Sequence, residues 1–164
     1  MAYLFRTPMI GAQPIGETSS TKRHPLGTVV QAIDPDMGEG DFIYVIASNS
    51  VAQYDAVAIK AGYKIAPLTI TNGKTCGEVG FVQIANGTKD TYMWAQKNGT
   101  PVVKLAIACQ ASVPLYATAT GGVLDDASTS VQLQGMVALT EATHSANAKT
   151  CLARYVTTQV EPAA

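Results

Sequence analysis

The chain has 164 residues, enough for one domain with its own core, and 14% of them are charged, against the roughly 25% usual in soluble domains. Its net charge of −1 excludes a general nucleic-acid binder, and its apolar runs are too short to cross a bilayer. We therefore expect no nucleic-acid partner and no membrane partner. We also expect something other than water to cover part of the surface.

Residues 1–25 are predicted to form an extended N-terminal arm. They contain three prolines and the polar run GETSSTKRH, and they lack helical or strand periodicity. The arm also carries side chains suited to anchoring on a partner, namely Tyr3, Leu4, Phe5, Met9, Ile10, Lys22 and Arg23. Apolar anchors gain by burial, so this composition predicts a partner surface. The start of the sequence lacks the regions of a secretory signal, which favours synthesis in the cytoplasm.

Residues 26–164 are predicted to form a single β domain. Short apolar runs rich in Val, Ile and Tyr alternate with turn signals about every twelve residues, a pattern typical of a compact antiparallel barrel or sandwich. Alternation places Val131 and Leu133 on the core face, and it does the same for Val103, Leu105 and Ile107. Residues 141–149 fit either a short helix or a loop. The expected strands cover residues 28–33, 42–47, 56–60, 63–70, 78–85, 91–97, 101–108, 114–119, 131–139 and 151–157.

Four dipeptides predict turns between these strands, because Asn and Gly adopt positive φ at little cost. They are Asn72-Gly73, Asn86-Gly87, Asn98-Gly99 and Gly121-Gly122. We expect the last two to close β-hairpins as tight two-residue turns.

The sequence contains no group of residues that predicts catalysis, a cofactor or a metal. The acidic run 34–41 lacks the ligand pattern of a calcium-binding EF-hand loop, so its charges are expected to be solvated. Neither His24 nor His144 accompanies a G-x-S-x-G turn, and the three cysteines lie too far apart for a CxxC site, which favours free thiols. We therefore expect that the protein is not an enzyme.

Tyr92, Trp94 and Tyr116 are candidates for an interface. Aromatic side chains with a polar edge are enriched at binding hot spots. Tyr92 and Trp94 lie two residues apart and therefore share one face of a predicted strand. That face fits either core packing or an interface, and the sequence leaves both open.

Several segments carry a resemblance to a known family. They are LGTVVQAIDPDMGEGDFIYVIA (26–47), YDAVAI (54–59), YMWAQKNGTPVVK and PLYATATGGVLDD, in this order along the chain. Together they resemble the capsid decoration, or cement, proteins of short-tailed double-stranded DNA bacteriophages. The resemblance implies a compact β fold, often a jelly roll, with no catalytic residues.

The same resemblance implies a location and partners. A decoration protein is made in the host cytoplasm and sits on the outer surface of the virion capsid as a homodimer or homotrimer. There it bridges subunits of the major capsid protein. The alternative expectation is a host-receptor or carbohydrate-binding β module of a head fibre or tail adaptor.

Overall fold

The computed structural model describes residues 4–5, 12–84, 87–143 and 147–160. This described part is all-β, as predicted, and besides its strands it contains a short α-helix, α1 (Ile70–Cys76), and a 3-10 turn, η1 (Ala61–Tyr63). The strands are β1 (Leu4–Phe5), β2 (Val29–Asp34), β3 (Gly38–Ala47), β4 (Ala56–Lys60), β5 (Lys64–Pro67), β6 (Glu78–Phe81), β7 (Tyr92–Gln96), β8 (Val102–Leu105), β9 (Pro114–Ala117), β10 (Val123–Asp125), β11 (Val131–Ala138) and β12 (Asn147–Val160).

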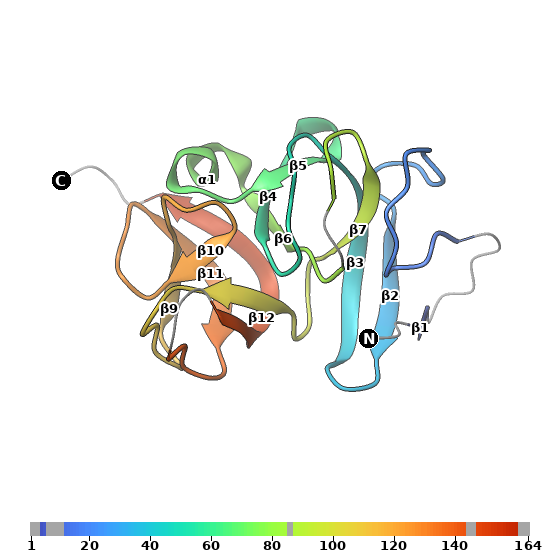
Figure 1. The fold of residues 1–164 in the computed structure, drawn as a ribbon. Helices are drawn as coiled ribbons and strands as arrows, with labels where there is room; N and C mark the ends of the chain where they lie inside the picture. The colour runs from blue at the N-terminus through green and yellow to red at the C-terminus, as the bar shows by residue number, and fades with distance from the viewer. Residues whose placement is uncertain (1–3, 6–11, 85–86, 144–146, 161–164) are drawn as a thin grey trace.

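The strand pairings close two rings, which we call the first and second barrels. In the first barrel β3 pairs with β5, β5 with β4, β4 with β6, β6 with β7, and β7 again with β3. In the second barrel β12 pairs with β11, β11 with β9, β9 with β10, β10 with β8, and β8 again with β12. Thr157 of β12 pairs with Glu78 of β6 and joins the two rings. Figure 1 shows β9 and β10 toward one end of the molecule and β2 and β3 toward the other.

Most pairings are antiparallel, as predicted, but β3 pairs with β5 and β8 pairs with β10 in parallel. The reason is geometric. Each ring contains an odd number of strands, and strand direction cannot alternate all the way around an odd ring, so each ring needs at least one parallel pair. The fully antiparallel arrangement expected from the sequence is therefore wrong at these two places.

Strand β4 is buried on both faces because it contributes to two cores. Val57 and Ile59 belong to the core of the first barrel, whereas Ala56 and Ala58 pack into the core of the second. Strands covered on both faces have continuous apolar sequences, which is what AVAI in β4 displays. A third apolar cluster lies where β2, β3 and β7 meet the N-terminal residues, and it contains Ile15, Val30, Ala32, Phe42, Tyr44 and Trp94.

The predicted turns have mixed outcomes. Gly121-Gly122 lies in the loop that connects the paired strands β9 and β10, so the hairpin is confirmed, although its loop spans residues 118–122 and is not a two-residue turn. Asn98-Gly99 does not close a hairpin, because β7 pairs with β3 and β6 while β8 pairs with β10 and β12. Asn72-Gly73 lies inside α1, where Asn72 and Thr69 form a reciprocal capping box. For the fourth dipeptide, Asn86 lies outside the described residues.

Strand limits differ from the predicted ranges where a special residue intervenes. The predicted strand 63–70 is divided, because β5 ends at Pro67 and Thr69 caps α1. β8 ends at Leu105, so Ile107 is 64% exposed and not in the core, whereas Val103 and Leu105 are buried as predicted. The sequence left residues 141–149 open as a short helix or a loop. In the structure, strand β12 begins at Asn147, so the C-terminal end of this range is a strand. Strand β10 was not predicted.

The burial of β11 confirms its predicted alternation. Val131 and Leu133 are buried, and Gln132 and Gln134 lie on the opposite face. The pattern changes after Gln134, where a register shift against β12 marks a β-bulge at Gly135. An irregularity of this kind carries no periodic signal in a single sequence.

Candidate functional site

Residues 12–25, which we call the docked segment, pack against the first barrel. Gln13, Ile15 and His24 are buried, with exposed fractions of 0%, 2% and 8%. Ser19 also forms a β-bridge with Tyr92 of β7. The prediction of an extended arm over residues 1–25 is therefore wrong for this part, because the segment has its own partners within the chain.

Gln13 is the centre of the docked segment and uses every polar group that it has. Its side-chain oxygen accepts a hydrogen bond from the Tyr44 hydroxyl at 2.7 Å, and its carbonyl oxygen accepts one from Trp94 Nε1 at 2.9 Å. Its side-chain nitrogen donates to the carbonyl oxygens of Tyr92 at 3.1 Å and Glu17 at 2.8 Å. Its backbone N–H donates to His24 Nε2 at 3.0 Å. A buried glutamine with all its groups paired rigidifies its surroundings.

The aromatic cluster consists of Tyr44, Tyr92 and Trp94, and His24 covers it. The His24 ring meets the Tyr44 ring edge to face at 5.1 Å and the Trp94 ring at 5.4 Å, while Tyr44 and Tyr92 stack at 6.2 Å. Burial raises the pKa of the Tyr44 phenol, so this hydroxyl stays protonated and remains a donor to Gln13. The rings of the cluster are apolar, and the Tyr44 hydroxyl and the Trp94 indole nitrogen both donate to Gln13 of the docked segment.

The predicted interface aromatics are thus separated by the fold. Trp94 is 1% exposed and belongs to the core, which decides between the two alternatives left open by the sequence. Tyr92 is half-buried beside it, whereas Tyr116 lies on β9 of the second barrel, opposite Gln132 and Asp125. The structure does not bring Tyr116 together with the other two.

The predicted anchors of the arm are placed only in part. Leu4 and Phe5 form β1, which pairs with Ile33 and Ala32 of β2. The basic residues Lys22 and Arg23 are exposed. The remaining anchors, Tyr3, Met9 and Ile10, lie outside the described residues.

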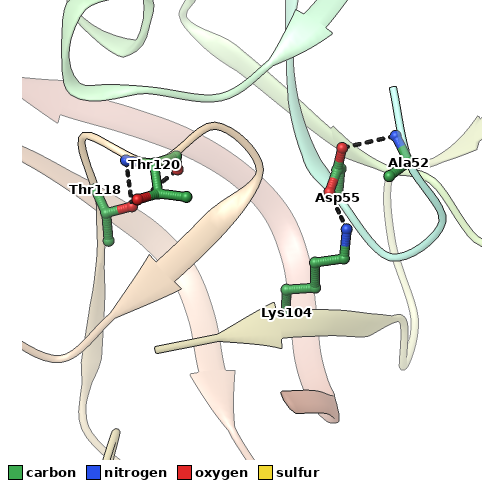
Figure 2. A network of polar contacts seen from close by, with 5 residues as sticks. All are labelled: Ala52, Asp55, Lys104, Thr118 and Thr120. Carbon is green, nitrogen blue, oxygen red and sulfur yellow. Dashed lines mark hydrogen bonds and ion pairs between the residues drawn. The ribbon is translucent and has the colours of Figure 1, made fainter. Parts of the chain in front are cut away.

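A buried ion pair connects the two barrels (Figure 2). Asp55 precedes β4 and is 4% exposed, and its Oδ1 lies 2.7 Å from Lys104 Nζ on β8. Its Oδ2 accepts a hydrogen bond from the Ala52 N–H at 2.7 Å. Backbone hydrogen bonds from Lys104 to Tyr54 and from Ala56 to Gly122 reinforce the same junction. Both carboxylate oxygens are thus occupied, which gives Asp55 the role of a structural joint.

Gly122 is required at this junction. Its φ is +79°, and a Cβ there would lie 2.4 Å from Asp55 Cγ. In the same loop, Thr118 Oγ1 accepts from the N–H of Thr120 and donates to neighbouring carbonyl oxygens (Figure 2). The sequence identified the glycine as a turn residue but gave no sign of the carboxylate beside it.

Cys109, Asp125 and Asp126 bring potential metal ligands within 4.8 Å of one another. Their other contacts are structural, since Asp126 Oδ2 accepts a hydrogen bond from the Gln110 N–H at 2.9 Å. Burial, with Asp126 and Asp125 nearby, raises the pKa of Cys109 to about 11, so the thiol remains protonated at neutral pH. The thiolate, and not the thiol, is the form that acts as a nucleophile. All three cysteines are free, as predicted.

The acidic run that the sequence placed in solvent contains one buried carboxylate. Asp34 is 2% exposed, and its Oδ1 accepts hydrogen bonds from the N–H groups of Asp36 at 2.8 Å and Met37 at 2.9 Å. This pattern is an Asx turn, which closes the hairpin between β2 and β3. The expectation that all charges of this run are solvated is therefore wrong for Asp34.

Large apolar side chains are exposed on both barrels. They are Val29, Tyr63, Ile107, Val137, Leu139, Tyr155 and Val160. Tyr155 is 77% exposed and borders a small surface depression lined also by Gln31, Glu39, Asp41 and Asn98. The described residues include no helix that is both long and apolar enough to cross a membrane.

Comparisons with known proteins identify no relative for this chain. No family model matches it, and neither a curated protein nor a solved structure does.

Proposed function

We propose that the protein is a virion structural protein that binds the outer surface of a phage capsid and bridges major capsid protein subunits. The observation that carries the proposal is the exposure of large apolar side chains at both barrels of a chain with few charges. Val29 lies on β2 beside the first barrel, and Val137 and Leu139 lie on or next to β11 of the second. Contacts at two places are what a bridging protein needs.

The N-terminal residues complete the proposal. The anchors Tyr3, Leu4, Phe5, Met9 and Ile10 would add apolar contacts, and the exposed Lys22 and Arg23 of the docked segment would meet acidic groups on the shell. The proposal also includes a jelly-roll-like fold and assembly as a homodimer or homotrimer. Because the chain binds assembled subunits better than free ones, mass action stabilises the shell. A standard interface of roughly 1,600 Å² at each seam is sufficient, and repetition over the lattice multiplies it.

Co-sedimentation with purified capsids tests the proposal. We expect binding to expanded capsids to saturate at a copy number fixed by the lattice symmetry, with little binding to unassembled capsid protein. A chain lacking the first eleven residues should bind about tenfold more weakly, a loss of about 1.4 kcal/mol. Non-saturating binding, or equal binding to assembled and unassembled subunits, would contradict the proposed function.

A second candidate, the carbohydrate-binding module, is favoured by one observation. The exposed Tyr155 ring stands beside Asp41, Asn98 and Gln31, and an aromatic face flanked by carboxylate and amide groups is suited to the apolar and polar faces of a sugar. Titration with host surface oligosaccharides tests this alternative. Tyr155→Ala should then abolish saccharide binding, whereas the matched variant Tyr63→Ala, which alters an exposed tyrosine away from this depression, should not.

A further inference from the structure

The contact between His24 and Gln13 fixes the protonation state of the imidazole. Nε2 of His24 lies 3.0 Å from the backbone nitrogen of Gln13, and a backbone N–H can only donate. Nε2 must therefore carry a lone pair and no proton. The docked segment as observed holds an unprotonated histidine.

The groups packed against the His24 ring are aromatic and carry no negative charge. The Tyr44 phenol of β3 and the Trp94 indole of β7 pack against the ring, and Tyr92 stacks behind Tyr44. Arg23 and Lys22, the neighbours of His24 within the segment, are themselves cations. The ion pairs of Lys97 with Glu78 and of Lys104 with Asp55 do not involve His24.

We propose that His24 and Gln13 form a pH-sensitive latch, which holds the docked segment on the aromatic cluster at neutral pH and releases it when the imidazole is protonated. Protonation would place an Nε2–H opposite the Gln13 N–H, so two donors would face each other in a buried site. The Gln13 hydrogen bonds to Tyr44 and Trp94 depend on the position that this contact fixes. Release therefore uncovers the aromatic cluster. The latch does not depend on the proposed capsid function.

The direction of the effect follows from proton linkage. The docked state binds no proton on Nε2, whereas a released imidazole can bind one, and histidine is the side chain that ordinarily changes charge between pH 5 and pH 8. Docking thus weakens as the pH falls through that range. Because one proton is bound per release, the equilibrium between released and docked segment rises by at most about tenfold per pH unit.

The chain contains its own probe for this transition. Trp94 is the single tryptophan of the sequence, and its indole nitrogen donates to the docked segment. We expect the fluorescence of the full-length protein to shift to longer wavelength between pH 7.5 and pH 5, while far-UV circular dichroism shows that the barrels remain folded. Amide exchange at Gln13, corrected for the intrinsic effect of pH, should speed up over the same interval.

Two variants test the assignment to His24. In His24→Gln, an amide oxygen can accept the same hydrogen bond without titrating, so the fluorescence shift should disappear. The matched control His144→Gln changes the other histidine of the chain and should retain the shift. The latch is refuted if the wild-type protein shows neither the fluorescence shift nor faster Gln13 exchange, or if His24→Gln retains the shift. If His24→Gln does not fold, the Gln13 exchange rates of the wild-type protein decide by themselves.

Discussion

Substitution of Lys104 by methionine should destabilise the protein through the junction between the barrels. Lys104→Met keeps the length of the side chain but removes the cation beside the Asp55 carboxylate. The Asp55 side chain is 6% exposed and keeps its hydrogen bond from the Ala52 N–H. Breaking a buried pair by removal of one partner costs about 3–5 kcal/mol. The Lys104 side chain is 26% exposed, so solvent screens part of the interaction, and we expect about 2–3 kcal/mol.

A double-mutant cycle separates the ion pair from other effects of the substitution. Asp55→Asn combined with Lys104→Met removes both charges, so the double variant should be more stable than the sum of the two single losses by at least about 1 kcal/mol. The exposed pair of Lys97 and Glu78 provides the control, since Lys97→Met should cost less than about 1 kcal/mol.

Urea denaturation at pH 7 measures these differences, with unchanged m-values as the sign of a comparable unfolding transition. Strictly additive losses, or a loss in Lys104→Met no larger than that in Lys97→Met, would refute the reasoning that the junction depends on a buried charge pair.

Three further predictions concern a turn, the docked segment and the thiols. Gly99→Ala should lower the free energy of unfolding by more than about 2 kcal/mol in urea denaturation, because φ is +106° and the new Cβ would lie 2.4 Å from a carbonyl oxygen of β3. The control Gly62→Ala, with φ +73° and open space around the new Cβ, should cost less. Equal losses would contradict the steric argument. Deleting the first 25 residues should lower the thermal midpoint of unfolding, because the deletion removes buried side chains. Deleting only the first eleven should leave that midpoint nearly unchanged. If the 25-residue deletion also leaves the midpoint unchanged, the docked segment is dispensable for stability. Burial raises the pKa of Cys109 to about 11 and of Cys151 to about 12, so the unfolded thiols ionise first and stability should fall as the pH rises from about 9. Replacing both thiols by alanine should flatten that alkaline dependence in urea denaturation, and an unchanged slope would contradict its assignment to them.

The strand pattern shows how far local sequence signals reach. The alternation at Val131 and Leu133 predicted which face of β11 is buried, because side chains on a strand point to opposite faces whatever lies beside it. The continuous apolar run in β4 indicated burial as well. It did not indicate that the two faces belong to two different cores, since that depends on strands far away in the sequence.

The candidate site was the least predictable part of the molecule. Gln13 and His24 lie among prolines and polar residues without periodicity, and their roles come from hydrogen bonds to each other and to β3 and β7. Trp94 is buried, and its indole nitrogen donates to this segment. A polar residue becomes structurally important when a partner far along the chain makes its burial favourable. A single sequence does not show which distant residues meet in space.

Local sequence patterns were sufficient to predict the all-β class, most strand positions and the need for glycine where φ is positive, as at Gly122. These depend on side-chain alternation and backbone sterics, which act within a few residues. Long-range packing explains why the strands close into two odd-numbered rings, why Asn98-Gly99 joins strands of different barrels, and why residues 12–25 dock on the sheet. Those outcomes depend on which strand edges and apolar surfaces meet across long separations in the chain, where many pairings satisfy the same local pattern and packing selects one.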